Sequence, residues 1–148
     1  MIYLLPHTIL NAATRFPNKT AFKCGNKSLT YHQLAAKMSQ LAATLYDLGV
    51  RKGDRVGIYL NRSIETAVAM YGIMHVGAVY VPLDPKAPTS RTLFVIQDCD
   101  LSILITNTTQ RRKIHNIVQA TTQISHIIGI AELDLVSTLA WEGLDSQL

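Results

Sequence analysis

The sequence has little cysteine, no long apolar run and no cluster of metal-binding residues, and each absence excludes a class of protein. Its 148 residues contain only Cys24 and Cys99, which are too few and too far apart for a disulfide framework or a zinc knuckle. The five histidines do not occur at metal-binding spacings such as H-E-x-x-H. We therefore expect two buried thiols and no metal site.

Segments that would direct the chain to or across a membrane are also missing. The longest apolar run, residues 67–81, is too short to span a bilayer and is interrupted by His75 and two glycines. The N-terminal MIYLLPHTIL has neither a basic leader nor a small-residue cleavage site. These features predict a cytoplasmic protein without a membrane span.

Positive charge is in mild excess, which raises the question of a nucleic-acid partner. The formal net charge is +4, but the only basic run is Arg111-Arg112-Lys113, and the looser group around Arg51 is broken by Gly53 and Asp54. Neither group is interleaved with the aromatic side chains that single-stranded nucleic acid binding uses. We expect no nucleic-acid partner.

What is present is the composition of a folded protein, with 48% hydrophobic and 16% charged residues and no low-complexity tract. The length fits one domain or part of a larger one. Strand-like and helix-like segments alternate along residues 1–130, which predicts an α/β fold with a mostly parallel sheet and helices packed on it. The expected strands are 20–24, 27–30, 56–60, 78–81, 101–106 and 124–130, and the expected helices are 7–16, 31–48, 64–76, 89–98 and 109–119.

The clearest helix-capping signals flank the helix expected at 31–48. Thr30 with Gln33 three residues later predicts a capping box, and Leu29 with Leu34 a hydrophobic staple. Gly49 stands where a left-handed cap would end the helix.

The other boundaries are less well marked. Ser63 is expected to cap the next helix, and Gly77 to end it. Pro82, Pro85 and Pro88 predict an extended, irregular linker. Asp84 is expected to cap the turn or to pair with Arg91, and the tail at 131–148 has no clear period, so no element is assigned to it.

An ordered series of motifs resembles the adenylate-forming ligase superfamily. Residues 29–34, LTYHQL, resemble the first core motif of amino-acid-activating adenylation domains and acyl-CoA ligases, and residues 74–98, MHVGAVYVPLDPKAPTSRTLFVIQD, resemble the second. The likeness runs from Met1 to about Ile130. The opening MIYLLPHTIL is in addition similar to AMP-forming acyl-CoA ligases associated with exosortase gene clusters.

This resemblance implies that residues 1–130 form an α/β subdomain of the large N-terminal domain of such a ligase. The complete enzyme would use ATP and Mg²⁺ to convert a carboxylic acid to an acyl-adenylate, and would pass the acyl group to the thiol of CoA or a carrier protein. The family's TSGxTGxPKG-type phosphate loop, its other nucleotide motifs and its late catalytic lysine are expected beyond Leu148, with 131–148 leading towards them. We therefore assign no catalytic residue to this chain and expect it to be inactive alone.

Arg111 and Arg112 are the only candidate site residues. By position they resemble arginines that hold the nucleotide phosphate of CoA in related acyl-CoA synthetases, although a solvated helix face is the ordinary interpretation of such a run. His32 and His75 are interpreted as structural.

Two other functions stay open. The chain could be a stand-alone α/β interaction or regulatory module derived from a ligase, or a Rossmann-like nucleotide binder, which its lack of G-x-G-x-x-G disfavours. The acid that is activated cannot be identified from these residues.

Overall fold

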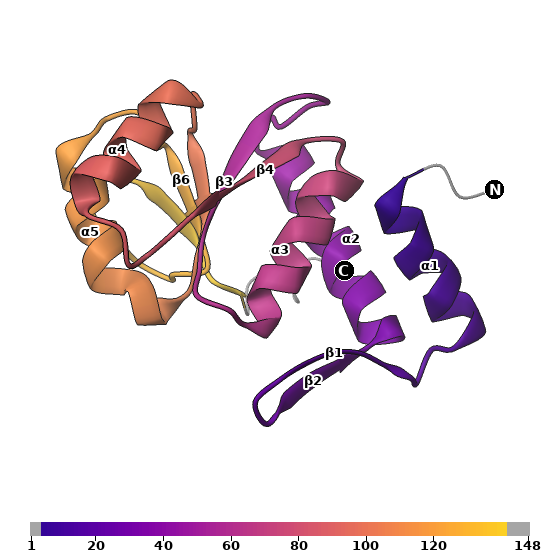
Figure 1. Cartoon of the computed structure of the whole chain (residues 1–148). Helices are drawn as coiled ribbons and strands as arrows, with labels where there is room; N and C mark the ends of the chain where they lie inside the picture. The colour runs from indigo at the N-terminus through magenta and orange to yellow at the C-terminus, as the bar shows by residue number, and fades with distance from the viewer. Residues whose placement is uncertain (1–3, 142–148) are drawn as a thin grey trace. The chain divides into compact units, whose positions relative to one another are not determined.

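The computed structural model describes residues 4–141, which divide into two compact units. Residues 4–54 and 62–78 form the first unit, and residues 55–61 and 79–141 form the second. Figure 1 shows the helices and strands of both units.

Three helices and a hairpin make up the first unit. The hairpin is antiparallel and turns at Gly25, whose φ of +60° is the left-handed conformation that the Gly25-Asn26 pair predicts. Helices pack on one another and on the hairpin. The elements are α1 (Leu5–Arg15), β1 (Thr20–Cys24), β2 (Lys27–Thr30), α2 (Tyr31–Asp47) and α3 (Ile64–His75).

The predicted capping box of α2 is confirmed. The Gln33 backbone N–H donates to the Thr30 hydroxyl oxygen at 3.1 Å, and the Thr30 backbone N–H donates to the Gln33 side-chain oxygen at 2.9 Å. The apolar stripe of the helix is fully buried, and Gly49 follows the helix with a φ of +98°. Both ends of helix α2 are therefore set by residues that could be identified from the sequence.

Helices α2 and α3 approach closely at Gly72. A Cβ built on Gly72 would lie 2.6 Å from the Cδ2 of Leu41, which is itself fully buried. Glycine lowers helix propensity, but here it allows the larger Leu41 side chain to pack against the α3 backbone.

Ser63 begins α3 differently from the prediction. Its hydroxyl makes no capping bond to a backbone N–H and instead lies 3.1 Å from the Thr66 hydroxyl. Gly77 follows the end of the helix with a φ of +91°, as expected.

The second unit contains a five-stranded, entirely parallel sheet in the order β4-β3-β5-β6-β7. This confirms the predicted α/β class. Helices α4 and α5 pack against each other and against the sheet, around a core that includes Ile96, Leu104, Ile114 and Ile127 (Figure 1). The elements are β3 (Arg55–Tyr59), β4 (Val79–Leu83), α4 (Thr89–Asp98), β5 (Ile103–Ile105), the 3-10 turn η1 (Thr108–Gln110), α5 (Arg111–Ala120), β6 (His126–Ile128) and β7 (Ser137–Leu139).

The linker prediction for Pro82 was wrong, and one strand lies where no element was assigned. Pro82 lies within β4 and not in a linker, which is possible because β4 is an edge strand and needs no N–H donor on its free side. Strand β7 forms within the tail at 131–148, where no periodicity marks it, and it pairs in parallel with β6. The predicted strands at 101–106 and 124–130 are shorter, at Ile103–Ile105 and His126–Ile128.

Of the two roles expected for Asp84, the structure shows the turn cap. Asp84 caps its turn by accepting from the Lys86 backbone N–H at 2.9 Å, whereas the Arg91 guanidinium lies over the Phe94 ring. Both cysteines are free, and they are half-buried where full burial was expected.

The carboxyl end of the sheet is locked around Thr106, which follows β5 and is fully buried. Its hydroxyl donates to the Tyr59 carbonyl at 2.6 Å, and its own carbonyl accepts from the Trp141 indole N–H at 2.8 Å. A Cβ on Gly129 would overlap that carbonyl, and Gly129 has a φ of +113°, so no other residue fits there.

Helix α3 ends in a half-buried histidine with an unusual proton affinity. Burial, followed by the positive charge of His7, lowers the pKa of His75 below its ordinary value of 6.5. Both effects disfavour the imidazolium in the folded state.

We expect acid to destabilise the chain partly through His75. The unfolded state binds a proton near pH 6.5 and the folded state only at lower pH, so the contribution of His75 to stability is complete above pH 6.5 and is lost as the pH falls towards the folded pKa. Urea unfolding between pH 7.5 and 5 should show a smaller loss of stability in His75→Gln than in the unchanged chain. An identical pH profile in the variant would contradict this account.

Candidate functional site

The candidate site is built where α5 starts, just beyond the carboxyl end of β5. Ligands bind open α/β sheets preferentially at this end of the strands. The apolar face of α5 is buried in the core through Ile114, Ile117 and Val118. Arg111 and Arg112 therefore lie exposed at the surface. The sequence of α5 thus dictates which of its residues can meet a ligand.

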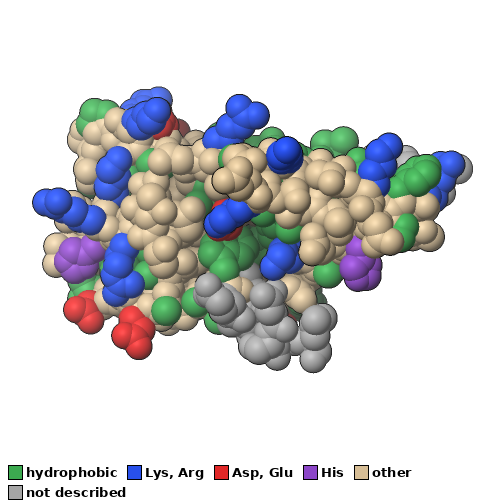
Figure 2. All heavy atoms as spheres, turned by 90° about the horizontal axis from the view of Figure 1, so that it is seen from below, with side chains coloured by type: hydrophobic (Ala, Val, Ile, Leu, Met, Phe, Trp, Pro, Cys, Tyr) green, Lys and Arg blue, Asp and Glu red, His purple; other side chains and the backbone are tan. Residues whose placement is uncertain are grey.

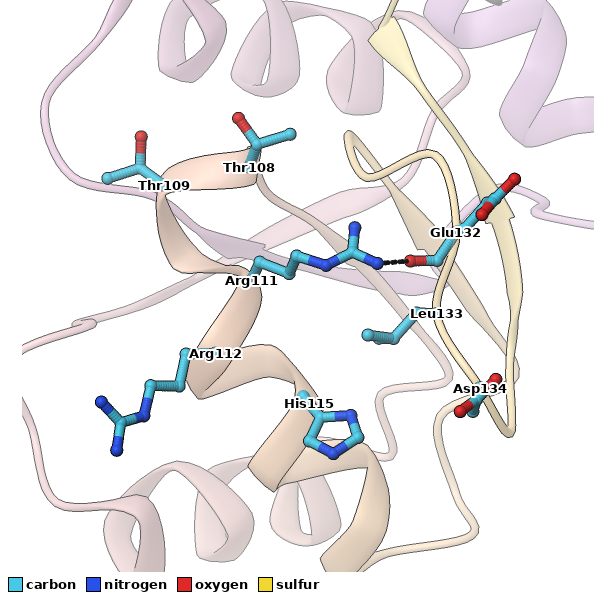
Figure 3. A pocket seen from close by; sticks show the side chains of 8 residues that line it. All are labelled: Thr108, Thr109, Arg111, Arg112, His115, Glu132, Leu133 and Asp134. Atoms are coloured by element: carbon cyan, nitrogen blue, oxygen red, sulfur yellow. Dashed lines mark hydrogen bonds between the residues drawn. The ribbon is translucent and has the colours of Figure 1, made fainter.

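An open cavity of about 610 Å³ lies beside these arginines. Figure 3 shows that one wall comes from η1 and the first turns of α5 and the other from the segment between β6 and β7. The structure therefore brings both predicted site residues to one cavity. Its lining residues are Thr108, Thr109, Arg111, Arg112, His115, Glu132, Leu133 and Asp134.

Arg111 spans the cavity and is already engaged. Its guanidinium donates a hydrogen bond to the main-chain carbonyl of Glu132 (Figure 3). Because that carbonyl belongs to the segment leading into β7, Arg111 ties the opposite wall to the start of α5. Its first role in this unit is to hold the cavity in shape.

Arg112 and Lys113 have different environments from Arg111. Lys113 donates from its ammonium to the Pro85 carbonyl at 2.6 Å, away from the cavity lining. Arg112 extends away from the Glu132 segment in Figure 3 and is exposed. Among the three basic residues of the run, Arg112 alone makes no hydrogen bond or ion pair with residues 4–141. Its five N–H donors are available to an anion.

The charge of the cavity is mixed. The α5 wall carries Arg111, Arg112 and His115, and the opposite wall carries Glu132 and Asp134. The Glu132 carboxylate points away from Arg111 (Figure 3). A phosphate group would therefore find its best position near Arg112, where no carboxylate competes for the guanidinium.

Of the residues that line this cavity, only Arg111 and Arg112 were predicted as site residues from the sequence. His115 could have been found, because it lies three residues after Arg112 and shares its helix face. Glu132 and Asp134 could not have been found, because nothing in the tail predicts that it returns to α5. Leu135 has a φ of +75°, and this left-handed conformation cannot be predicted from a leucine, which rarely adopts it.

Elsewhere in this unit, Tyr59 is buried beneath the sheet's carboxyl end. Burial, with a smaller effect of the Asp84 carboxylate, raises the pKa of its phenol above 10.0. Tyr59 is thus neutral at physiological pH, and its backbone carbonyl, not its phenol, makes the contact to Thr106.

Metal-binding clusters and membrane-spanning helices are also absent from residues 4–141. Within 4–141 there is no group of three or more His, Cys, Asp or Glu side chains that could hold a metal ion. None of the helices in this range is long and apolar enough to cross a membrane. Figure 2 shows Lys and Arg side chains spread across the face in view, with uncharged surface between them.

Comparison with known proteins gives consistent matches. A family model described as "AMP-binding enzyme" matches residues 9–147. Syringomycin synthase SyrB1 from Pseudomonas syringae pv. syringae is 39% identical over 105 residues, which are 71% of this chain and 17% of the synthase.

Solved structures match over nearly the whole chain. Acetoacetyl-CoA synthetase from Streptomyces lividans aligns with a TM-score of 0.83 and 25% identity, covering 97% of this chain and 25% of the synthetase. The nonribosomal peptide synthetase FmoA3, solved with α-methyl-L-serine-AMP bound, aligns with a TM-score of 0.77 and 26% identity, covering 98% of this chain and 15% of FmoA3. The chain thus spans a quarter or less of these relatives.

We expect Arg111→Ala to loosen the segment at 131–139, because it removes the bond to the Glu132 carbonyl. A hydrogen bond with a net worth of about 0.5–1.5 kcal/mol corresponds to roughly two- to tenfold faster local opening. Amide hydrogen exchange measured by mass spectrometry would show this, with Arg112→Ala as the matched neighbour that leaves the exchange of 131–139 unchanged. Equal exchange in both variants would exclude the bracing role of Arg111.

Proposed function

Since the chain belongs to the AMP-binding enzyme family, we propose that it is the N-terminal part of an AMP-forming ligase that joins a carboxylic acid to a thiol. The match over residues 9–147, together with the five-stranded parallel sheet, is the observation that carries this proposal. Relatives named as CoA synthetases and as peptide synthetases both support it.

The reaction has two steps. An oxygen of the carboxylate attacks the α-phosphorus of ATP, the bond to the β-phosphate bridging oxygen breaks, and acyl-adenylate and pyrophosphate form. A thiol then attacks the acyl carbon, giving a thioester and AMP, while the thiol proton is released. Both steps develop negative charge on oxygen, which enzymes stabilise with preorganised donors.

The described residues do not fit the nucleotide. Triphosphate binding calls for a glycine-rich backbone cradle with a Lys, and for acidic or hydroxyl ligands to Mg²⁺, and residues 4–141 contain neither a G-x-x-x-x-G-K-[ST] pattern nor a metal-binding cluster. We therefore assign no step of the adenylation to this chain. Its proposed contribution is a folded scaffold, with its sheet, for segments of a longer protein.

The described residues do fit one part of the thiol acceptor. We infer that Arg112 binds the nucleotide phosphate of CoA, with Arg111 bracing the opposite wall of the cavity. The exposed and unpaired guanidinium of Arg112 supports this assignment, as does the engagement of Arg111 by Glu132. The sequence prediction treated the two arginines as equivalent, and we propose separate roles for them because only Arg111 is hydrogen-bonded to the Glu132 segment.

The isolated 148-residue chain should catalyse no exchange of pyrophosphate into ATP with any amino acid or carboxylic acid, because its described residues carry no phosphate-binding loop. A longer protein that contains this chain and continues past Leu148 should catalyse exchange with a restricted set of acids. Exchange by the isolated chain, or a folded longer protein that is inactive with a broad panel of acids, would refute the proposal. Circular dichroism of both proteins serves as the folding control.

In that longer protein, Arg112→Ala should weaken the preference for CoA over 3′-dephospho-CoA. The loss of a guanidinium–phosphate contact worth about 1.5–3 kcal/mol corresponds to a roughly ten- to hundredfold rise in the KM for CoA and little change for the dephosphorylated analogue. Steady-state kinetics with both thiols would measure this, with Lys113→Ala as the control because Lys113 is turned to Pro85. An unchanged preference in Arg112→Ala would remove the assignment.

A further inference from the structure

A second cavity lies wholly within the first unit, between strand β1 of the hairpin and the start of α3. It has a volume of about 220 Å³ and a mostly apolar lining. This is smaller than the roughly 300–1,000 Å³ of pockets that hold drug-sized ligands, so the cavity suits a small ligand and cannot enclose a nucleotide. Nothing in the proposed ligase reaction uses it.

Aromatic side chains form the apolar part of this groove. The rings of Phe22 and Tyr71 meet edge to face, with centroids 6.1 Å apart and planes at 61°. Met70 adds a flexible thioether to the same lining. Phe22 is 37% exposed, which is unusual for a phenylalanine already paired with another ring. This surface can accept an aromatic or aliphatic group.

One cationic side chain lies at the rim of the groove. Arg62 comes from the segment before α3, is exposed and lines the cavity. Lys23 lies between Phe22 and Cys24 in β1, so its side chain points to the opposite face of the strand from the Phe22 ring and the Cys24 thiol. Over residues 4–141 the Arg62 side chain makes no ion pair. Glu65 lies in the first turn of α3 but is not part of the lining. An apolar floor with a free guanidinium at its rim is complementary to an amphipathic anion, and the planar Arg fork suits a carboxylate.

We propose that this groove binds a small organic carboxylate, with its apolar tail against Phe22 and Tyr71 and its carboxylate at Arg62. The ligand is held by burial of its tail and oriented by its charge. This groove shares no lining residue with the cavity beside Arg111 and Arg112, which we call the Arg112 cavity. Occupancy of the groove does not depend on adenylation.

A thiol in the groove provides a direct probe of occupancy. The Cys24 Sγ lines the cavity and lies 3.7 Å from the Arg62 carbonyl oxygen. Cys99 is also free and half-buried, but it belongs to the second unit. A ligand in the groove covers Cys24 and leaves Cys99 as an internal control.

The test uses the full chain and the neutral reagent iodoacetamide, with the modification of each cysteine followed by mass spectrometry. The probe is 3-phenylpropionate at about 10 mM, which suits a millimolar Kd, and its uncharged match is 3-phenyl-1-propanol. We expect the acid to slow alkylation of Cys24 severalfold and to leave Cys99 unchanged, while the alcohol has a much smaller effect. The variant Arg62→Gln should lose the advantage of the acid over the alcohol.

Three results would overturn the proposal. They are no protection of Cys24 by the acid, equal protection by acid and alcohol, and parallel slowing at Cys99. The substituted side chain is exposed, so the variant should fold, and an unchanged circular dichroism spectrum verifies this.

Discussion

The hydrogen bonds of Thr106 hold together the end of the sheet on which the candidate site depends. Its hydroxyl reaches the Tyr59 carbonyl of β3, its N–H reaches the Ile128 carbonyl of β6, and its carbonyl receives the Trp141 indole N–H. A fully buried threonine must satisfy all of these groups, since an unpaired one would cost about 1–3 kcal/mol. Gly129 is required beside it because a side chain would occupy the space of the Thr106 carbonyl.

This constraint explains why the tail returns to the body of its unit. The indole of Trp141 and the pairing of β7 with β6 bring residues 131–139 back towards α5, and Arg111 completes the connection at the Glu132 carbonyl. The Arg112 cavity exists only because of that return. The basic run at the start of α5, a pattern that is usually a solvated helix face, thereby comes to line a cavity with a second wall.

The two cavities place positive charge in different surroundings. In the second unit the cations lie opposite carboxylates at the end of a sheet. In the first unit Arg62 lies at the rim of an aromatic groove. Membership of the AMP-binding enzyme family bears on the ligand proposed for the cavity beside Arg112. The ligand proposed for the groove at Phe22 rests on local geometry alone.

The α/β class, the capping box of α2, the glycines that end α2 and α3, and the candidate arginines could be predicted from the sequence, because each depends on residues close together in the chain. Three features could be seen only in the folded chain: Pro82 lies in an edge strand, β7 forms in an aperiodic tail, and Arg111 is hydrogen-bonded while Arg112 is not. A parallel strand is stabilised by a partner distant in sequence, and an arginine is engaged by whichever carbonyl the fold brings to it. Such contacts leave no local pattern to detect.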